Sequence, residues 1–418
     1  MAKSADPAAS LRAEMVAQLR RRGGLSDPRV AAALAEVPRH LFVPGVELSE
    51  AYADRAIATH HRDGVPTSSA SQPAIVATML EQLRPPPGGS VLEIGAGTGY
   101  NAALLSRLVD PSGRVVTVDI NAQVADEARD HLSRAGITNV EVICGDGASG
   151  WVGGAPYDGI VVTAGASDLA PAWVDQLAAE GRLVLPLSIR GVQQCVAFAR
   201  ADGHLRSVAI CECGFMPLVG AMANTDAREP VPGHPGVYVQ TAADAEVDVG
   251  VVGPALDDRR TKANIGINCS VREVFGSLRR WLAFHEPNSA SLTYIGPPEV
   301  ADASGVPGVL DFPGGGLAQR SSPCIIGPAG LAVLDLATPP APVEDSVLDT
   351  MLDLAVSGYG EAQLEMNKLR QSVTAWDAAS RPGADRLRID AYPSDALPPE
   401  VEGSVHFALH ASFVVSSA

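Results

Sequence analysis

A glycine-rich turn between an apolar segment and a helical segment constrains this chain more than any other feature. Residues 91–100 read Val-Leu-Glu-Ile-Gly-Ala-Gly-Thr-Gly-Tyr. Glycines tolerate positive φ and let a ligand lie close to the backbone. A helical pattern at 101–109 follows at once, and the first N–H groups of a helix are free to bind a ligand. The sequence therefore predicts a buried strand, a binding loop and a helix, which is one unit of an α/β fold.

The residues after this turn repeat the alternation of strand and helix. Short apolar stretches predict strands, and amphipathic stretches predict helices. The expected strands are 90–94, 114–120, 140–144, 157–163 and 182–187, with helices at 101–109, 122–135 and 171–178 and antiparallel strands at 194–199 and 207–215. This order predicts an α/β fold with a Rossmann-like, doubly wound sheet whose parallel strands are covered on both faces.

The chain divides into three parts by composition and pattern. Residues 1–87, with helical patterns between 10 and 50, and the core at 88–222 are predicted to form one catalytic domain. From about residue 224 the chain is rich in Pro, Gly and Asp, and we predict a C-terminal α+β extension domain at 223–418. Its expected elements are helices at 271–285 and 346–370 and strands at 386–392 and 405–415.

Composition excludes some partners. The formal net charge is −17, which disfavours nucleic acids and anionic membranes because both attract a basic face. No apolar run is as long as a membrane span and no signal peptide is recognised, so we expect a cytoplasmic protein. The six cysteines are scattered without a CxxC pair. Cys211 and Cys213 beside His204 are too few ligands for zinc, so no metal is expected.

The spacing of the glycines favours one cofactor. Gly-x-Gly-x-Gly, with Glu93 two positions before the first glycine, is typical of class I methyltransferases that bind S-adenosylmethionine, whereas an NAD-dependent dehydrogenase carries Gly-x-Gly-x-x-Gly. Asp119 and Thr163 end predicted strands and Asp146 follows one, at the edge where α/β sheets bind ligands. Each alone is better explained as a solvated strand end, but together they indicate a site. Asp119 can accept the ribose hydroxyls, and Asp146 the adenine amino group.

The predicted cofactor-binding residues are Glu93, Gly95, Gly97, Thr98, Gly99, Asp119, Ile120, Asp146 and Gly147.

Motifs outside this loop resemble those of the protein-L-isoaspartate O-methyltransferases. Ser69-Ala70-Ser71-Gln72-Pro73 is similar to the family signature Thr-Ile-Ser-Gln-Pro. Further similar segments are Val-Pro-Arg-His-Leu-Phe-Val-Pro at 37–44, Gly-Asp-Gly at 145–147, Gly-Arg-Leu-Val-Leu-Pro at 181–186 and Phe-Met-Pro-Leu-Val at 215–219. The resemblance covers roughly residues 10–222.

The resemblance implies a peptide or protein partner that carries an aspartate or isoaspartate carboxylate. It places the functional serine at Ser71, while a cap for the helix that begins near Pro73 is an alternative role for the same side chain. The implied substrate-binding residues are Thr67, Ser69, Gln72, Thr163, Ala164 and Pro186. A carboxylate is ionised at neutral pH, so no general base is expected.

Two purposes fit a carboxyl methyltransferase. The methyl ester collapses to a succinimide, which hydrolyses to aspartate or isoaspartate. The family includes longer bacterial members, and some of them resemble this chain in the extension and act on an aspartate of a ribosomally made peptide (a lanthipeptide or graspetide precursor). The extension at 223–418 therefore favours a dedicated peptide substrate over general isoaspartate repair. A non-catalytic binding protein is disfavoured because every expected cofactor position is filled. The sequence leaves the oligomeric state open.

Overall fold

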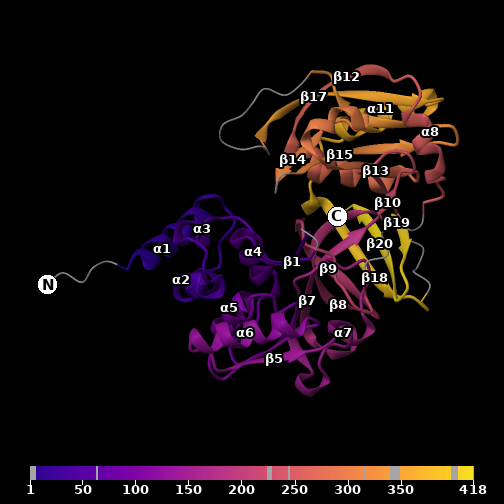
Figure 1. Cartoon of the computed structure of the whole chain (residues 1–418). Helices are drawn as coiled ribbons and strands as arrows, with labels where there is room; N and C mark the ends of the chain where they lie inside the picture. The colour runs from indigo at the N-terminus through magenta and orange to yellow at the C-terminus, as the bar shows by residue number, and fades with distance from the viewer. Residues whose placement is uncertain are drawn as a thin grey trace. The chain divides into compact units, whose positions relative to one another are not determined.

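The computed structural model describes residues 6–62, 65–223, 228–242, 245–314, 317–338, 349–396 and 403–417. The chain forms two compact units (Figure 1). The first unit comprises Met1–Leu187, Gln193–Asn224 and Arg388–Val415. The second comprises Ser188–Val192, Thr225–Leu387 and Ser416–Ala418.

A ten-stranded sheet forms the centre of the first unit, with the order β19-β20-β18-β9-β8-β7-β6-β3-β4-β5. Its parallel part comprises β3 (Ser90–Ile94), β4 (Arg114–Asp119), β5 (Val140–Cys144), β6 (Tyr157–Val162) and β7 (Leu177–Ile189). The chain runs outward from β3 through β4 to β5, and then returns to the other side of β3 at β6. The strand order therefore reverses between β3 and β6, where open α/β sheets bind ligands. The predicted doubly wound fold is confirmed.

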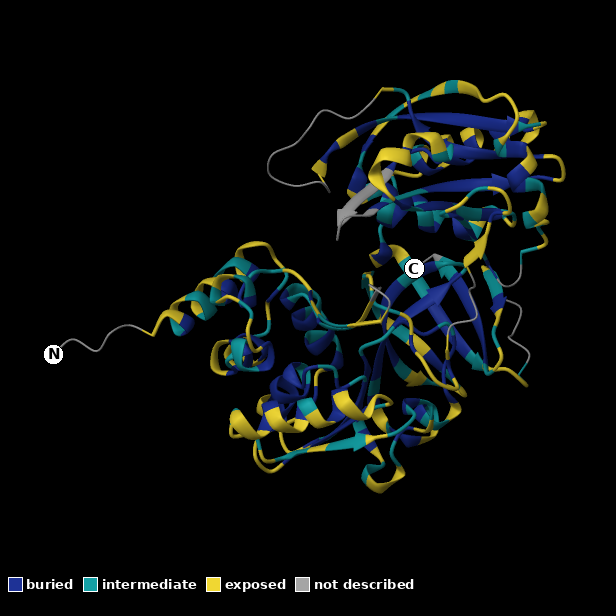
Figure 2. Cartoon of the chain, in the orientation of Figure 1, coloured by how far each residue is buried: buried dark blue, intermediate teal, exposed yellow. Residues whose placement is uncertain are grey.

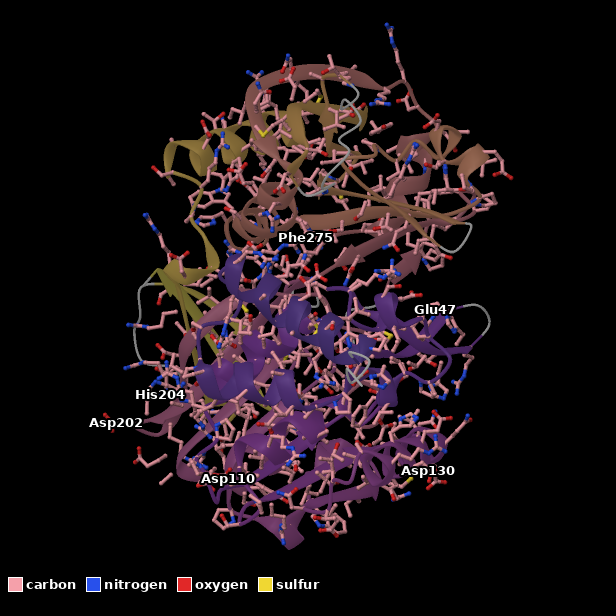
Figure 3. The ribbon with its side chains drawn as sticks, turned by 90° about the vertical axis from the view of Figure 1, so that its left-hand side faces the viewer. Glu47, Asp110, Asp130, Asp202, His204 and Phe275 are labelled. Atoms are coloured by element: carbon pink, nitrogen blue, oxygen red, sulfur yellow. The ribbon has the colours of Figure 1, made fainter. Side chains whose placement is uncertain are left out.

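Helices cover the parallel sheet, and their burial follows the sequence pattern. The helices of this unit are α1 (Pro7–Arg21), α2 (Pro28–Glu36), α3 (Leu48–Ala51), α4 (Pro73–Leu83), α5 (Tyr100–Leu108), α6 (Ala122–Arg134) and α7 (Pro171–Gln176). Helix α6 begins where the Asn121 side chain accepts the Gln123 and Val124 N–H groups. It buries Val124 and Leu132 toward the sheet and leaves a polar outer face, visible in Figure 2. Acidic side chains such as Asp110, Asp130 and Asp202 lie at the surface (Figure 3).

Antiparallel strands extend this sheet and include the end of the chain. They are β8 (Val192–Ala201), β9 (His204–Glu212), β18 (Leu387–Pro393), β19 (Ser404–Phe407) and β20 (Ala411–Ser417). Strand β18 pairs with β9, with Asp390 opposite Arg206. The Asp390 carboxylate is buried and lies 2.8 Å from Arg206 Nε and 3.1 Å from Arg388 Nε. The structure thus differs from the expected boundary at 223, because Arg388–Val415 joins the first unit through contacts that a local pattern does not reveal.

The second unit contains an eight-stranded antiparallel sheet with helix α11 (Gln363–Ala378) packed on it. The strands are β10 (Arg228–Pro230), β11 (Val237–Thr241), β12 (Thr261–Ser270), β13 (Ser289–Gly296), β14 (Leu310–Gly314), β15 (Leu317–Ile326), β16 (Gly330–Leu336) and β17 (Met351–Gly360). The expected helix at 271–285 is present as α9 (Val271–Glu273), a π-helical turn (Val274–Leu278) and α10 (Arg279–His285). A short helix, α8 (Val252–Leu256), precedes β12.

Residues 346–348 of the expected single helix at 346–370 lie outside the described residues, and over 349–370 the expectation of one helix is wrong. The middle part of this range is strand β17, and helix α11 begins only at Gln363. Residues 352 and 354–359 are buried or nearly so, because β17 lies between β16 and β12 with its side chains covered. A strand buried in this way has a mostly apolar sequence without strict alternation, and periodicity does not distinguish it from a buried helix.

Among the described residues, no helix is long and apolar enough to cross a membrane. All six cysteines lie in described segments, and each is a free thiol. Within the same segments, no three His, Cys, Asp or Glu side chains are grouped so that they could hold a metal ion.

Replacing Trp376 with alanine tests the core of the second unit. The Trp376 side chain is fully buried, its Nε1–H donates to Ser277 Oγ (2.7 Å), and Arg381 lies 5.1 Å from its ring. We expect Trp376→Ala to lower the free energy of unfolding by about 3–5 kcal/mol, as measured by urea denaturation. The control Leu364→Ala, on the same helix but 60% exposed, should change it by less than about 0.5 kcal/mol. Similar losses in both variants would contradict this core.

Candidate active site

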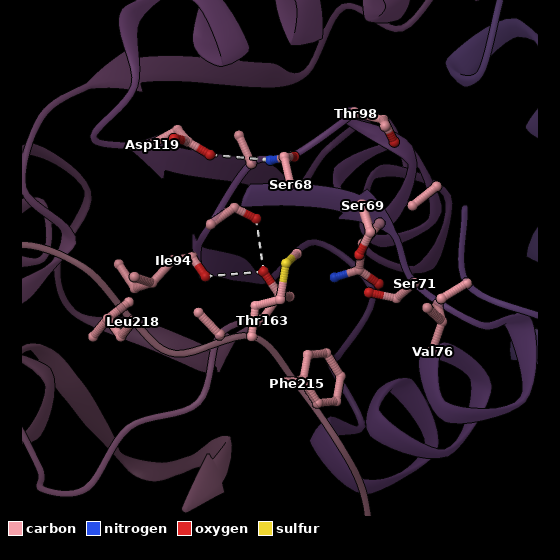
Figure 4. Close-up of a pocket in the computed structure, with 18 of the residues that line it drawn as sticks. Ser68, Ser69, Ser71, Val76, Ile94, Thr98, Asp119, Thr163, Phe215 and Leu218 are labelled. Carbon is pink, nitrogen blue, oxygen red and sulfur yellow. Dashed lines mark hydrogen bonds between the residues drawn. The ribbon is translucent and has the colours of Figure 1, made fainter. Parts of the chain in front are cut away.

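A cavity of about 580 Å³ opens at the carboxyl ends of β3, β4 and β6 (Figure 4). Most of the predicted site residues line it together. They are Thr67, Ser69, Ser71, Gln72, Glu93, Gly95, Gly97, Thr98, Asp119, Ile120, Gly147, Thr163 and Ala164. Because these residues come from separate strand ends and from the loop before α4, the sheet topology brings them to one place.

The glycine-rich loop is fixed by close backbone contacts. Gly95 has φ 97°, and a Cβ there would lie 2.5 Å from Thr163 Oγ1, so only glycine fits. The Thr163 hydroxyl in turn lies 2.7 Å from Gly95 O and 3.1 Å from Ile94 O. The Gly97 N–H donates to Asp119 Oδ2 (3.1 Å), as Figure 4 shows. Asp119 therefore holds the loop while it lines the cavity.

Glu93 lies at the base of the cavity and is fully buried. It accepts hydrogen bonds from Thr117 Oγ1 (2.6 Å) and Asn101 Nδ2 (2.8 Å). Burial raises the pKa of Glu93 to about 7, although both hydrogen bonds lower it, and the nearby Asp119 charge adds to the increase. A positive charge in the cavity would favour the ionised form of this carboxyl group.

A β-hairpin also lines the cavity. Strands β1 (Ile57–Arg62) and β2 (Val65–Ala70) pair in antiparallel fashion, and β2 carries Thr67 and Ser69 into the cavity. His60 on β1 lies 3.1 Å from Glu127 Oε2 on α6, which ties the hairpin to a helix that covers the sheet.

Ser71 follows this hairpin and is not the helix cap. The N-cap of α4 is Gln72, and the Ala74 N–H is satisfied by Asp54 Oδ1 (2.9 Å) from a distant part of the chain. The Ser71 hydroxyl forms no hydrogen bond with any described residue and lines the cavity near Ser69 (Figure 4). The hydroxyl is therefore free to bind a ligand.

Arg39 fixes the backbone that carries Ser71, and the sequence analysis did not assign it to the site. Its side chain is fully buried, and its Nη2 donates to Ser71 O (3.0 Å) and Ala70 O (3.3 Å). The guanidinium lies 5.5 Å from the centre of the Tyr100 ring. Burial lowers its pKa. The only available signal was its place in the motif at 37–44.

A second missed part is the segment 212–219, which lines the cavity beyond β9. Gln193 Oε1 accepts the Phe215 N–H (2.5 Å). Gly165 donates to Met216 O and accepts from the Leu218 N–H, both at 2.8 Å. The segment is thus held against the loop that follows β6. Its sequence was noticed as a motif, but nothing in the motif showed that it forms a wall.

Three predicted residues lie outside the lining. Gly99 has φ 84° at the start of α5 and packs against Ala128. The oxygens of Asp146 accept the N–H groups of Ala148 (2.9 Å) and Ala221 (2.8 Å). Pro186 O accepts the Ala166 N–H. The roles predicted for these three in ligand binding stay predictions.

The charge of the cavity limits its chemistry. Its lining, all of it in described segments, contains the acids Glu93, Asp119 and Glu212 but no Lys, Arg or His. Burial raises the pKa of the Cys213 thiol well above its usual value, so this group stays protonated. The cavity therefore suits a ligand with a positive charge, and it can position an acceptor that needs no basic side chain.

Comparisons with known proteins agree with this geometry. A family model described as "Protein-L-isoaspartate(D-aspartate) O-methyltransferase (PCMT)" matches residues 10–223. A protein-L-isoaspartate O-methyltransferase of Methanoregula boonei is 46% identical over 47% of this chain and 87% of its own length. The corresponding protein of Methanoculleus marisnigri is 42% identical over 52% of this chain and 94% of its own. A solved protein-L-isoaspartate O-methyltransferase, 22% identical with a TM-score of 0.50, covers 91% of this chain and 96% of its own, which shows a shared fold.

The raised pKa of Glu93 predicts a pH-dependent stability. A carboxyl whose pKa rises from 4.5 to about 7 on folding adds stability that is fully present below pH 4.5 and lost as the pH rises through about 7. Each pKa unit corresponds to about 1.4 kcal/mol, so the loss is on the order of 3 kcal/mol. Urea denaturation of the wild type at pH 4.5, 6 and 8 should show this loss of stability as the pH rises. Glu93→Gln should not show it, because the variant lacks the carboxyl group. The control Glu141→Gln, at an exposed site on β5, should follow the wild type. Parallel curves for Glu93→Gln and the wild type would refute the prediction.

Proposed function

The chain belongs to the protein-L-isoaspartate O-methyltransferase family, and from this premise we propose that it repairs isoaspartate by methylating its α-carboxylate with S-adenosylmethionine. The observation that carries the proposal is the cavity that joins the glycine-rich loop to the Ser71 segment. One part of this cavity suits the cofactor and the other suits the acceptor.

The residues present fit S-adenosylmethionine. The loop at Gly95 and Gly97 leaves backbone close to the cavity, and Asp119 stands at the end of β4 where an acid can accept ribose hydroxyls. Glu93 and Asp119 place negative charge beside a ligand that carries ammonium and sulfonium groups. When bound, the cofactor supplies a methyl group activated by a positively charged sulfur.

The acceptor side works by positioning. An isoaspartyl α-carboxylate is ionised at neutral pH, so no side chain has to remove a proton. The free Ser71 hydroxyl can donate to this carboxylate or to the flanking peptide, and Arg39 holds the Ser71 backbone in place. Thr163, Ala164 and the wall at 212–219 enclose the other side. Holding both reactants in line is a major source of rate in such transfers.

The product explains the use of this reaction. An α-methyl ester of isoaspartate is an activated acyl group, and the peptide nitrogen that follows can attack it and expel methanol. The resulting succinimide hydrolyses in part to normal aspartate. Repeated methylation therefore converts isoaspartate to aspartate without a second enzyme.

General repair is better supported than the dedicated peptide substrate that the sequence favoured. The family model and the relatives that match this part of the chain carry the name protein-L-isoaspartate O-methyltransferase, and isoaspartate is the residue that general repair acts on. A solved protein with that name extends over 91% of this chain, so a long C-terminal part of this fold does not by itself indicate a dedicated peptide. A ribosomally made precursor peptide stays the alternative outcome of the test.

The test uses two short peptides of one sequence that contain either isoaspartate or aspartate. With S-adenosylmethionine present, we expect methyl transfer to the isoaspartyl peptide and only background methylation of the aspartyl peptide. Mass spectrometry of the peptides measures both. The same result should hold in an unrelated flanking sequence, because general repair accepts many sites. The proposal would be contradicted if neither isoaspartyl peptide were methylated, or if only the aspartyl peptides were methylated. Either result would favour a dedicated substrate.

Replacing Ser71 with alanine tests the acceptor side. We expect kcat/KM for the isoaspartyl peptide to fall about 10–100-fold, since loss of one positioning contact can cost this much. The affinity for S-adenosylmethionine, measured by calorimetry, should change less than about twofold. Ser133→Ala, at an exposed site on α6, is the control and should behave as the wild type. Unchanged turnover in Ser71→Ala would remove Ser71 from the mechanism.

A further inference from the structure

A buried carboxylate lies at the end of the loop that follows β6. Asp168 is 6% exposed, and its two oxygens accept different backbone N–H groups. Oδ1 accepts from its neighbour Leu169 (2.7 Å), and Oδ2 accepts from His410 (2.7 Å), far away in the sequence. Asp168 thus joins the loop to the turn between β19 and β20.

That turn is itself firmly held. The Ala408 N–H donates to Ala411 O (2.9 Å), and the Ser394 N–H at the end of β18 donates to His410 O (3.1 Å). The β20 residues Phe413 and Val414, which follow the turn, are buried. Both backbone polar groups of His410 are therefore bound: its C=O accepts from the Ser394 N–H, and its N–H donates to Asp168.

The other end of the loop reaches the cavity. Thr163 and Ala164 line it, and Gly165 forms the hydrogen bonds with Met216 and Leu218 that hold the wall segment. Ala166 donates to Pro186 O (2.9 Å). A shift of the loop at Asp168 would therefore be passed to residues that enclose the acceptor.

We propose that Asp168 is a positioning residue, which fixes the loop at 163–170 through the His410 N–H and so holds the acceptor wall in place. This inference rests on the proposed function. The family match ends at residue 223, so the bond to His410 comes from a part of the chain outside that match. The C-terminal hairpin thereby takes part in building the catalytic unit.

Both oxygens of the carboxylate are needed. An asparagine has one oxygen, so one of the two N–H groups would face an NH₂ group and lose its acceptor. A buried N–H without a partner is unfavourable, and the loop would move to satisfy it. Asp168→Asn keeps the size of the side chain, but it removes one of the two acceptor oxygens and the negative charge of the carboxylate.

The experiment compares Asp168→Asn with the control Asp175→Asn, at an exposed site on α7. We expect KM for the isoaspartyl peptide to rise about tenfold in Asp168→Asn, with kcat and the S-adenosylmethionine affinity within about threefold of the wild type. Hydrogen exchange followed by mass spectrometry should show faster exchange at 163–170 and 408–411, while the control stays unchanged. Unaltered KM and exchange would overturn the proposal. A proportional loss of kcat, cofactor affinity and melting temperature would also overturn it, because that result indicates a merely structural role.

A second variant isolates the bond. His410→Pro removes the N–H donor and keeps Asp168, so its effect on KM and on exchange at 163–170 should match that of Asp168→Asn and should not add to it in the double variant. Additive effects would overturn the proposal. Hydrogen exchange is measured without substrate turnover, so it tests the Asp168–His410 bond independently of the methylation assay. If the wild type failed to methylate isoaspartate, the proposed function would fail while the exchange data still tested the bond.

Discussion

The buried guanidinium of Arg39 is the interaction on which the active site depends. Its Nη atoms lie within hydrogen-bonding distance of four backbone carbonyls: Ala51 at the end of α3, Arg55 between α3 and β1, Ala70 at the end of β2, and Ser71. Burying a cation is costly unless polar groups surround it, and the Tyr100 ring supplies a further favourable face. These carbonyls lie together only when α3, the segment that leads into β1 and the end of the hairpin at Ser71 are all in place. The geometry around Ser71 is therefore a property of the folded unit and not of its local sequence.

The sequence predicted the fold best where the residues of a segment are enough to determine its secondary structure. Strands 90–94 and 140–144 match the structure residue for residue, because each is a short run of mostly apolar residues between turns. Prediction failed where long-range pairing decides the outcome. Strand β17 is apolar like a buried helix, and only its neighbours β16 and β12 make it a strand. Strands β18, β19 and β20 have ordinary strand patterns, but nothing local to them shows that they extend the catalytic sheet rather than the sheet of the second unit.

The same division applies to the candidate site. Asp119, Thr163 and the glycines were found because ligand sites lie at the strand ends of an α/β sheet. The order of strands and helices, and so the position of these ends, can be predicted from the sequence. Arg39, Asp54 and Gln193 act on the backbone of distant segments, so their partners appear only in three dimensions. Ser71 was assigned through its resemblance, with a helix cap as the rival role. That rival fails because Asp54 supplies the cap from another part of the chain.

Under the proposed function, selection of isoaspartate has to come from shape, because charge does not distinguish isoaspartate from aspartate. Aspartate and isoaspartate each carry one free carboxylate, and they differ in whether a methylene group lies in the side chain or in the backbone. The cavity lining, which falls wholly within described segments, offers no Lys, Arg or His to attract either carboxylate. The attracting charge then enters with the cofactor, and the walls decide which carboxylate lies in line with the methyl group. A displacement of about 1 Å is enough to lose much of such a rate. This requirement explains why the Ser71 backbone, the segment at 212–219 and the loop at 163–170 are each fixed by hydrogen bonds to remote parts of the chain.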